Sequence, residues 1–198
     1  MSKPEKNSKL GDAEIRPALR AHLQAKHAHD AETVVIEELG ICCGQVRVDL
    51  AVVNGFLHGY EIKSDRDSLR RLSSQVDLYS RVLDQATIVT GERHLSEAME
   101  IVPFWWGILR IEPTSRSPLF KTERRGRRNP CRDPRSLVKL LWLDDAIALL
   151  ELYNVARGVR GKPRRLVWDR ICESFDVDEI AAAVRGRLKA RAQRPCNP

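Results

Sequence analysis

Two carboxylates and one lysine lie in neighbouring stretches that alternate between apolar and polar residues. Asp49 lies within the run 46–53 (VRVDLAVV), and Glu61 and Lys63 close the run 56–63 (FLHGYEIK). Carboxylates held side by side in a half-buried sheet repel one another unless a cation compensates their charge. A hard divalent metal such as Mg²⁺ provides that compensation through oxygen ligands. These residue types therefore predict a metal site on the two runs.

The turn between the two runs decides whether the carboxylates can meet. The dipeptide Asn-Gly that separates the runs is a strong signal for a β-hairpin. A three-residue loop over 54–56 pairs Val53 with Leu57. The same register sets Asp49 opposite Glu61 on one face of the sheet. A two-residue loop would turn Glu61 to the other face, so the site requires an odd loop or a bulge.

The predicted site has the chemistry of phosphodiester hydrolysis. Asp49 and Glu61 would hold the metal, together with the carbonyl oxygen of Ile62. The metal would bind a phosphodiester oxygen and lower the pKa of a bound water. Lys63 would lie within reach of that water, where its ammonium group orients the nucleophile and offsets developing negative charge.

Two questions about this site stay open at the level of residue types. Glu37 or Glu38, at the end of the preceding predicted strand, could supply a third carboxylate. Alternatively, the charged residues form only an exposed face of the hairpin, with Lys63 paired to Glu61 or Asp49. The aspartate in the middle of an apolar run and the E-x-K triplet just before a helix favour the functional interpretation.

Short segments around these residues resemble a known nuclease superfamily. The segments 47–49 (RVD) and 59–64 (GYEIKS) resemble the PD-(D/E)XK superfamily, and 75–79 (QVDLY) resembles the Q-x-x-x-Y element of its RecB-like members. The stretch 38–94 is similar to a bacterial family of small, mostly uncharacterised proteins assigned to that superfamily. Val48 stands where the superfamily's name-giving proline would be, a change that removes no charged group.

The resemblance implies a fold, an activity and a set of site residues. The fold is a four-stranded mixed sheet flanked by helices, and the activity is phosphodiester hydrolysis that depends on Mg²⁺ or Mn²⁺. Asp49, Glu61 and Lys63 match the catalytic set, and Glu38 matches the upstream acidic position of the metal site. The residues that would face DNA or support the site are Gln75, Tyr79 and Ser64.

The elements that must position these residues alternate along the first 112 residues. The helix over 66–83 serves as a crossover, so the strand after it should lie parallel to the strand 56–63. This order predicts an α/β fold with a mixed four- to five-stranded restriction-endonuclease-like sheet flanked by helices, followed by a C-terminal helical subdomain. Apolar spacing predicts helices over 13–25, 66–83 and 95–101 and strands over 33–39, 46–53, 56–63, 86–90 and 105–111.

Charge divides the chain unevenly. The first 112 residues hold 14 Lys/Arg and 17 Asp/Glu, whereas the remaining residues hold 20 and 10. A strongly basic second half favours a polyanionic partner such as DNA. We expect a disordered leader over 1–11, a nuclease-like core over 12–112, a basic loop or linker over 113–135, a helical subdomain over 136–192 and a tail over 193–198.

The expected basic loop contains four closely spaced arginines. They would contact DNA phosphates without reading sequence, or they would belong to a flexible solvated loop. The last two predicted helices, 165–175 and 178–191, fit either a helix-turn-helix-like pair or a plain helical hairpin. The arginines are Arg124, Arg125, Arg127 and Arg128.

Composition excludes several classes of protein. Hydrophobic residues make up 42% of the 198 residues and charged residues 31%, which is typical of a soluble globular protein. No apolar run approaches the roughly 20 residues of a membrane span, and the N-terminus lacks the hydrophobic stretch of a secretory signal. The five cysteines form no C-x-x-C pair, which favours reduced thiols in a cytoplasm over a zinc site or a disulfide framework.

These patterns together predict a cytoplasmic, metal-dependent DNA endonuclease acting in repair, mobile-element biology or defence. A non-catalytic nucleic-acid-binding protein on the same fold is the alternative. A regulatory protein whose basic half binds an acidic protein is a third possibility. The sequence leaves the oligomeric state open, and a homodimer is compatible with it.

Overall fold

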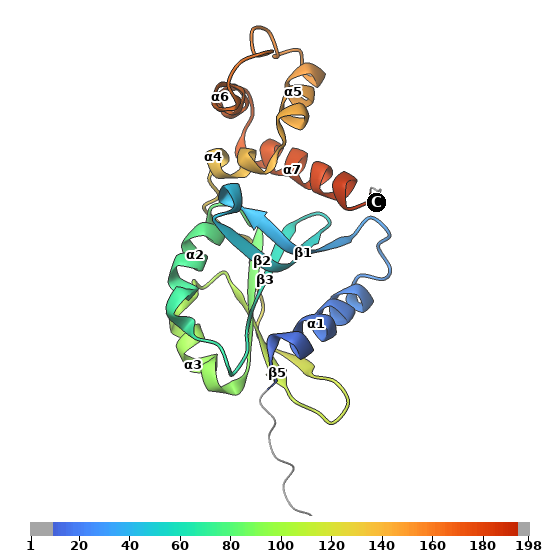
Figure 1. Cartoon of the computed structure of the whole chain (residues 1–198), viewed down its shortest axis with the longest axis vertical. Coiled ribbons are helices and arrows are strands. Elements are labelled where there is room, and N and C mark those ends of the chain that lie inside the picture. The colour runs from blue at the N-terminus through green and yellow to red at the C-terminus, as the bar shows by residue number, and fades with distance from the viewer. Residues whose placement is uncertain (1–9, 194–198) are drawn as a thin grey trace, which may run out of the picture.

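A six-stranded sheet forms the centre of the computed structural model, which describes residues 10–193 (Figure 1). The strands follow one another across the sheet in chain order, antiparallel from β1 to β3, parallel from β3 to β5, and antiparallel again from β5 to β6. The predicted mixed α/β sheet is confirmed, with six strands instead of four or five. Its strands are β1 (Val34–Ile41), β2 (Val46–Val53), β3 (Leu57–Lys63), β4 (Gln85–Thr90), β5 (Gly107–Glu112) and β6 (Leu119–Arg124).

The hairpin between β2 and β3 has the three-residue loop that the predicted site requires. Val53 pairs with Leu57, and the ladder continues as far as Leu50 opposite Tyr60. Beyond that pair the two strands separate, because β2 stays paired with β1 and β3 stays paired with β4. The sheet therefore opens between β2 and β3 at the level of Asp49. We call this opening the fork.

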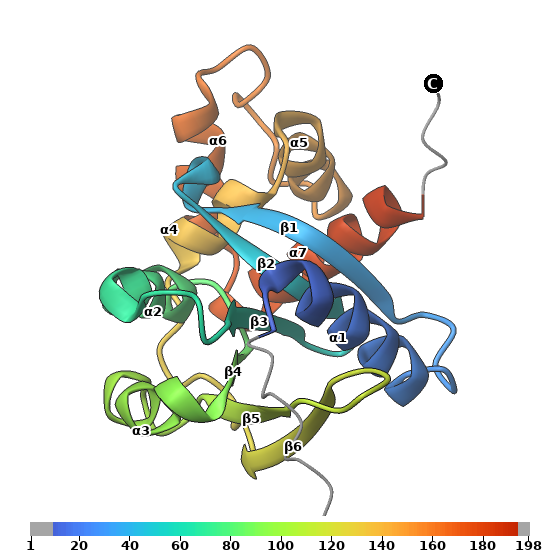
Figure 2. The same cartoon turned by 60° about the horizontal axis from the view of Figure 1, so that its bottom comes forward.

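Helices cover both faces of the sheet (Figures 1 and 2). Helix α1 (Asp12–Lys26) lies on one face, and α2 (Leu72–Ser80) and α3 (Glu92–Ile101) lie on the other. The two faces bury separate hydrophobic clusters, since side chains of a strand alternate between them. The residues that α1 buries are Ile15, Leu19 and Leu23.

Helix α2 is shorter than its periodicity predicts. The spacing of apolar residues indicates a helix over 66–83, whereas α2 begins only at Leu72. The Asp67 carboxylate accepts hydrogen bonds from the amide and the hydroxyl of Ser64, both at 2.7 Å, and the Ser68 hydroxyl caps a short 3₁₀ turn. Such local bonds between side chains and the backbone compete with helix formation and delay its start.

The segment 113–135 does not form the long loop that its composition predicts. Strand β6 occupies part of it and pairs with β5 at the edge of the sheet. Charged, exposed side chains are usual on an edge strand, and they hide β6 from a hydrophobic pattern. After β6, the amides of Arg127, Asn129 and Asp133 donate to carbonyl oxygens of the core at 2.7–2.8 Å. The backbone of this segment is therefore hydrogen-bonded to the core and is not a free loop.

Four helices form a layer at one end of the sheet, at the top of Figure 1. Their buried side chains, such as Ile171 and Val184, belong to the same hydrophobic cluster as Val48 and Tyr79 of the core. None of the helices within residues 10–193 combines the length and apolar character needed to cross a membrane. The helices of this layer are α4 (Pro134–Leu137), α5 (Leu143–Leu152), α6 (Arg164–Ser174) and α7 (Val177–Ala192).

Buried ion pairs also fasten the helical layer to the sheet. Asp84 is 2% exposed, and its carboxylate accepts from the amide of Leu57 at 2.8 Å. Arg132 and Arg185 donate to the two Asp84 oxygens at 2.5 and 2.9 Å. Arg132 also pairs with Asp178 at the start of α7. Part of the positive charge of the second half thus compensates the protein's own carboxylates.

Two of the predicted segments lie at the ends of the chain. The predicted leader over 1–11 and tail over 193–198 lie almost entirely outside the described residues.

Candidate active site

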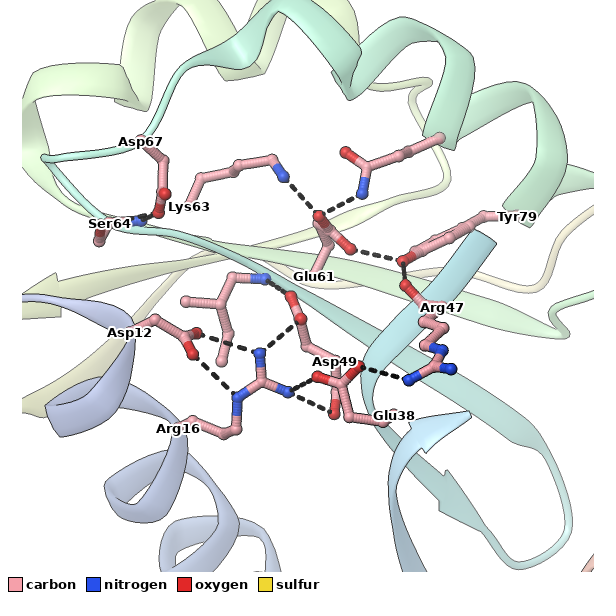
Figure 3. A network of polar contacts seen from close by, with 12 residues as sticks. Asp12, Arg16, Glu38, Arg47, Asp49, Glu61, Lys63, Ser64, Asp67 and Tyr79 are labelled. Carbon is pink, nitrogen blue, oxygen red and sulfur yellow. Dashed lines mark hydrogen bonds and ion pairs between the residues drawn. The ribbon is translucent and has the colours of Figure 1, made fainter. Parts of the chain in front are cut away.

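A polar cavity of about 470 Å³ lies in the fork (Figure 3). Residues from α1, β1, β2, β3 and α2 line it, so five elements must come together to form it. We call it the acidic cavity, because five of its nine charged side chains are carboxylates. The acidic side chains that line it are Asp12, Glu38, Asp49, Glu61 and Asp67, and the basic ones are Arg16, Arg47, Lys63 and Arg71.

Where β2 and β3 separate, the side chain of Asp49, and not a backbone carbonyl of β2, accepts a hydrogen bond from β3. Its Oδ2 accepts from the amide of Ile62 on β3 at 2.7 Å, and its Oδ1 accepts from Arg16 at 2.8 Å. Burial and then the charge of Glu61 raise the pKa of Asp49 to about 6, although the Ile62 amide and Arg16 act in the opposite direction. The two carboxylates therefore line one cavity, but the predicted pairing of Asp49 opposite Glu61 on one face is not formed, because the ladder ends at Leu50 and Tyr60 and Asp49 bonds to Arg16 of α1.

Glu61 is held by three side-chain donors on the α2 side of the sheet. It is 2% exposed, and its Oε1 accepts from Lys63 at 2.5 Å and from Gln75 at 2.6 Å. The hydroxyl of Tyr79 lies 2.5 Å from Oε2 and 2.9 Å from the carbonyl oxygen of Arg47. Burial, together with the negative charge of Glu61, raises the pKa of Tyr79, so this hydroxyl keeps its proton and remains a donor. Gln75 and Tyr79, the two helix residues that the resemblance singles out, thus both contact Glu61.

Arg16 is a central residue of the cavity that the sequence did not reveal. Its guanidinium group, on α1, donates to Asp12 at 3.1 Å, to the Asp49 carboxylate and carbonyl oxygen, and to Glu38 (Figure 3). Burial alone would lower the pKa of Arg16, but the hydrogen bond to Asp12 and the charge of Asp49 outweigh it, and the pKa is raised. The spacing of Asp12 and Arg16 identifies a helix surface pair. That spacing does not indicate that Arg16 also contacts Asp49 on β2.

Glu38, and not Glu37, lines the acidic cavity. Glu38 has a positive φ of 53° and lies on β1 beside Asp49, whereas Glu37 pairs with Arg20 at 2.6 Å outside the cavity. The conformation at Glu38 is one that side chains other than glycine adopt infrequently. The choice between the two glutamates depends on this backbone feature.

Ser64 has a structural role next to the site. Its amide and hydroxyl both bond to Asp67, and it does not line the cavity, whereas Asp67 does. Ser64 therefore shapes the turn that follows Lys63.

Comparison with known proteins identifies relatives of the chain. A model of the family described as bacteriophage P4 protein cII matches residues 5–196. The chain belongs to this family. Protein cII of Enterobacteria phage P4 is 32% identical to this family member over 118 residues, which are 60% of the chain and 44% of the relative. The chain thus spans less than half of the length of that curated relative.

Among solved structures, the SPO1766 protein of unknown function from Silicibacter pomeroyi is similar to this cII-family chain. The match covers 78% of the chain and 97% of that protein, with 17% identity and a TM-score of 0.45.

The four arginines expected to hold DNA do not surround the acidic cavity of this cII-family chain. Arg124 donates to the carbonyl oxygens of Trp106 and Pro103 at 2.8 and 3.0 Å, and Arg128 pairs with Asp178 of α7. Both side chains therefore make contacts within the protein. Arg125 and Arg127 are exposed, and neither makes an ion pair within residues 10–193.

The donor set of the acidic cavity suits a hard divalent cation. Asp49 and Glu61 offer carboxylate oxygens, and burial together with the charge of Glu61 raises the pKa of Asp49. Every oxygen of the two carboxylates accepts a hydrogen bond from the protein. Within residues 10–193, no group of three or more His, Cys, Asp or Glu is arranged to hold a metal ion. The oxygen chemistry fits, and Arg16 and Lys63 now provide the compensating charge.

Proposed function

We propose that this cII-family protein is a metal-dependent DNA nuclease whose active site is the acidic cavity. The observation that carries the proposal is the fork, where Asp49, Glu61 and Lys63 line one cavity. The resemblance of the same residues to PD-(D/E)XK nucleases supports it. Membership of a phage protein family favours mobile-element biology over repair or defence as its setting.

Asp49 and Glu61 would hold Mg²⁺ or Mn²⁺ in this proposal, with Glu38 as the third carboxylate. The bound metal would polarise the phosphodiester and supply a water of lowered pKa. Lys63 lies 2.5 Å from Glu61 and can position the nucleophilic water and offset charge on the phosphate. Gln75 and Tyr79 fix the orientation of Glu61 through its two oxygens. Residues that hold a reacting group in one geometry lower the barrier by reducing the reorganisation that the reaction requires.

A DNA cleavage assay tests the proposal. Supercoiled plasmid and branched DNA are incubated with the protein in Mg²⁺, in Mn²⁺ and in EDTA, alongside Asp49→Ala and Lys63→Ala. We expect cleavage that requires metal and is lost in both variants. Glu37→Gln is the matched control, since it changes a neighbouring glutamate that does not line the cavity. Cleavage that survives in EDTA or in both alanine variants would contradict the proposal.

A non-catalytic nucleic-acid-binding protein is the second candidate function. One observation favours it: the oxygens of Asp49 and Glu61 are all engaged by protein donors, as in an ion-pair network that only stabilises the fold. Salt-sensitive binding to DNA without cleavage, across several substrates and both metals, would support this function instead.

A further inference from the structure

A second cavity lies on the α1 face of the sheet, at the other end of β3 from the fork. It measures about 530 Å³, a size usual for small-molecule sites, and its walls come from the end of α1, from β3 and β4, and from the end of β6. Side chains of β3 alternate between the two cavities, so that His58 and Tyr60 line this one while Glu61 and Lys63 line the acidic one. Figure 2 shows α1 crossing the face on which it opens.

The charges that line this second cavity are all positive. They belong to Lys26, Arg124 and Arg125, and the lining contains no Asp or Glu. Within residues 10–193, none of the three has a carboxylate within ion-pair distance. Elsewhere in the molecule most arginines of the second half are paired with carboxylates, among them Arg132. We call this site the basic cavity.

Arg124 shows most clearly that the basic cavity lacks a counter-charge. Its Nε and Nη2 donate to backbone carbonyl oxygens at 2.8 and 3.0 Å, while its Nη1 makes no hydrogen bond within the described part of the chain. Burial lowers the pKa of Arg124. Carbonyl oxygens satisfy donors, but they do not neutralise a charge. A partly buried guanidinium group without an anion is costly, and a bound anion would relieve that cost.

The floor of the basic cavity is polar, uncharged and fixed in position. His58 Nε2 lies 2.8 Å from the hydroxyl of Thr87, and the hydroxyl of Tyr60 lies 3.3 Å from His58 Nδ1. The rings of His58 and Tyr60 stack with centroids 4.3 Å apart. Burial lowers the pKa of His58 to about 3, so this imidazole is neutral at physiological pH. The positive charge of the cavity therefore comes from its rim alone.

The mouth of the cavity combines an aromatic ring with amide groups. Phe56 is 42% exposed, and Asn54 and Gln85 lie beside it in the lining. The side-chain oxygen of Asn54 accepts from the amide of Phe56 at 3.0 Å, which leaves the NH₂ group of Asn54 available. An exposed aromatic ring binds a flat heterocycle by stacking, and amide groups bind its polar edge. Cations at the rim bind phosphate.

We propose that the basic cavity binds a nucleotide, with its phosphate at Lys26, Arg124 and Arg125 and its base against Phe56. The nucleotide is either a free mononucleotide or the 5′-phosphorylated terminal nucleotide of a DNA strand. Both present the same chemistry to the site. The proposal does not depend on the nuclease function, because the two cavities share no lining residue.

Binding is measured in EDTA, so that the acidic cavity and its metal play no part. Isothermal titration calorimetry uses deoxynucleoside 5′-monophosphates and inorganic phosphate as probes. Fluorescence anisotropy then follows a labelled single-stranded oligonucleotide, with and without a 5′-phosphate. Competition by the free mononucleotide alone identifies that ligand. A preference for the phosphorylated oligonucleotide identifies the strand end.

Arg125→Glu is the test variant, because Arg125 is exposed and its replacement should not impair folding. Arg127→Glu is the matched control: it makes the same charge change two residues away, but Arg127 does not line the cavity. We expect Arg125→Glu to weaken nucleotide binding by about tenfold or more, the loss of one charge-assisted contact, and Arg127→Glu to leave it within about twofold. No binding of any probe at millimolar concentration would overturn the proposal. Equal weakening by both variants would overturn it as well.

Discussion

The two cavities at opposite ends of β3 differ in how their charges are compensated. In the acidic cavity, Asp49 and Glu61 are each in contact with a cation, Arg16 or Lys63. In the basic cavity, the cations have no carboxylate partner within the described residues. The difference shows that clustered charge alone does not indicate a ligand. Each of the two central carboxylates of the acidic cavity has a basic partner in the protein, whereas within residues 10–193 no carboxylate pairs with the cations of the basic cavity.

The largest effect that bears on this comparison is expected for the chemistry of the acidic cavity. If Lys63 acts on the reacting groups, Lys63→Met should reduce the rate of metal-dependent plasmid cleavage by about 10²–10³-fold. The unfolding free energy, measured by urea denaturation, should change too little to explain this loss of rate. A variant that cuts at the wild-type rate would show that Lys63 only compensates the charge of Glu61. Cleavage rates of Arg125→Glu serve as the comparison from the other cavity.

The pH dependence of stability tests the compensation at Asp49. Its pKa is raised from 3.8 to about 6, so the folded protein binds this proton more tightly than the unfolded chain does. The resulting stabilisation is complete below about pH 4 and is lost as the pH rises through 6. In EDTA, the unfolding free energy of the wild type minus that of Asp49→Asn should fall by about 2–3 kcal/mol between pH 4 and 7. A difference that stays constant would mean that Arg16 compensates Asp49 fully.

Removal of Arg16 should expose the charge excess of the acidic cavity. Arg16→Met leaves Asp49, Asp12 and Glu38 without their shared cation, and we expect a loss of about 2 kcal/mol in unfolding free energy. Millimolar Mg²⁺ or Mn²⁺ should restore part of this loss if the carboxylates bind metal. Arg20→Met is the control on the same helix, because the exposed pair of Arg20 with Glu37 contributes little. A metal-insensitive variant would argue against metal binding in the fork.

The smallest effect is expected at the rim of the basic cavity. Arg125→Ala removes a cation that pairs with no carboxylate in the described part of the chain, so the unfolding free energy should stay unchanged or rise by up to about 0.5 kcal/mol. Chemical denaturation at low ionic strength measures this change. A loss of more than about 1 kcal/mol would show that Arg125 makes a stabilising contact and would remove the contrast between the cavities.

Much of the site follows from local sequence signals. The Asn-Gly turn and the alternation around it are sufficient to predict the β2–β3 hairpin and its register from Val53 and Leu57 as far as Leu50 and Tyr60. Gln75 and Tyr79 follow from the resemblance to RecB-like nucleases, and both contact Glu61. These features depend on residues close together in the chain, where turn geometry and the two-residue period of a strand leave little freedom.

The basic second half shows which contacts local signals do not predict. Its clustered arginines predict a DNA-binding loop, yet Arg128 and Arg132 pair with Asp178 of α7, and Arg132 also pairs with the buried Asp84. These ion-pair partners lie 46 to 50 residues apart in the chain, so no helical or strand periodicity in the sequence indicates that they meet. Strand β6 was missed for a similar reason, because an edge strand needs no apolar pattern on its exposed side.

The sequence by itself determined the mixed α/β class, the hairpin and the residue types of the acidic cavity, because these depend on turns and side-chain periods. Only the tertiary structure decided that β2 and β3 separate beyond Leu50 and Tyr60 and that Arg16 reaches Asp49 from α1. It also decided that the cations beside His58 have no carboxylate partner within residues 10–193. Charge compensation depends on distances between elements that the chain brings together only on folding, so composition records the charges but not their partners.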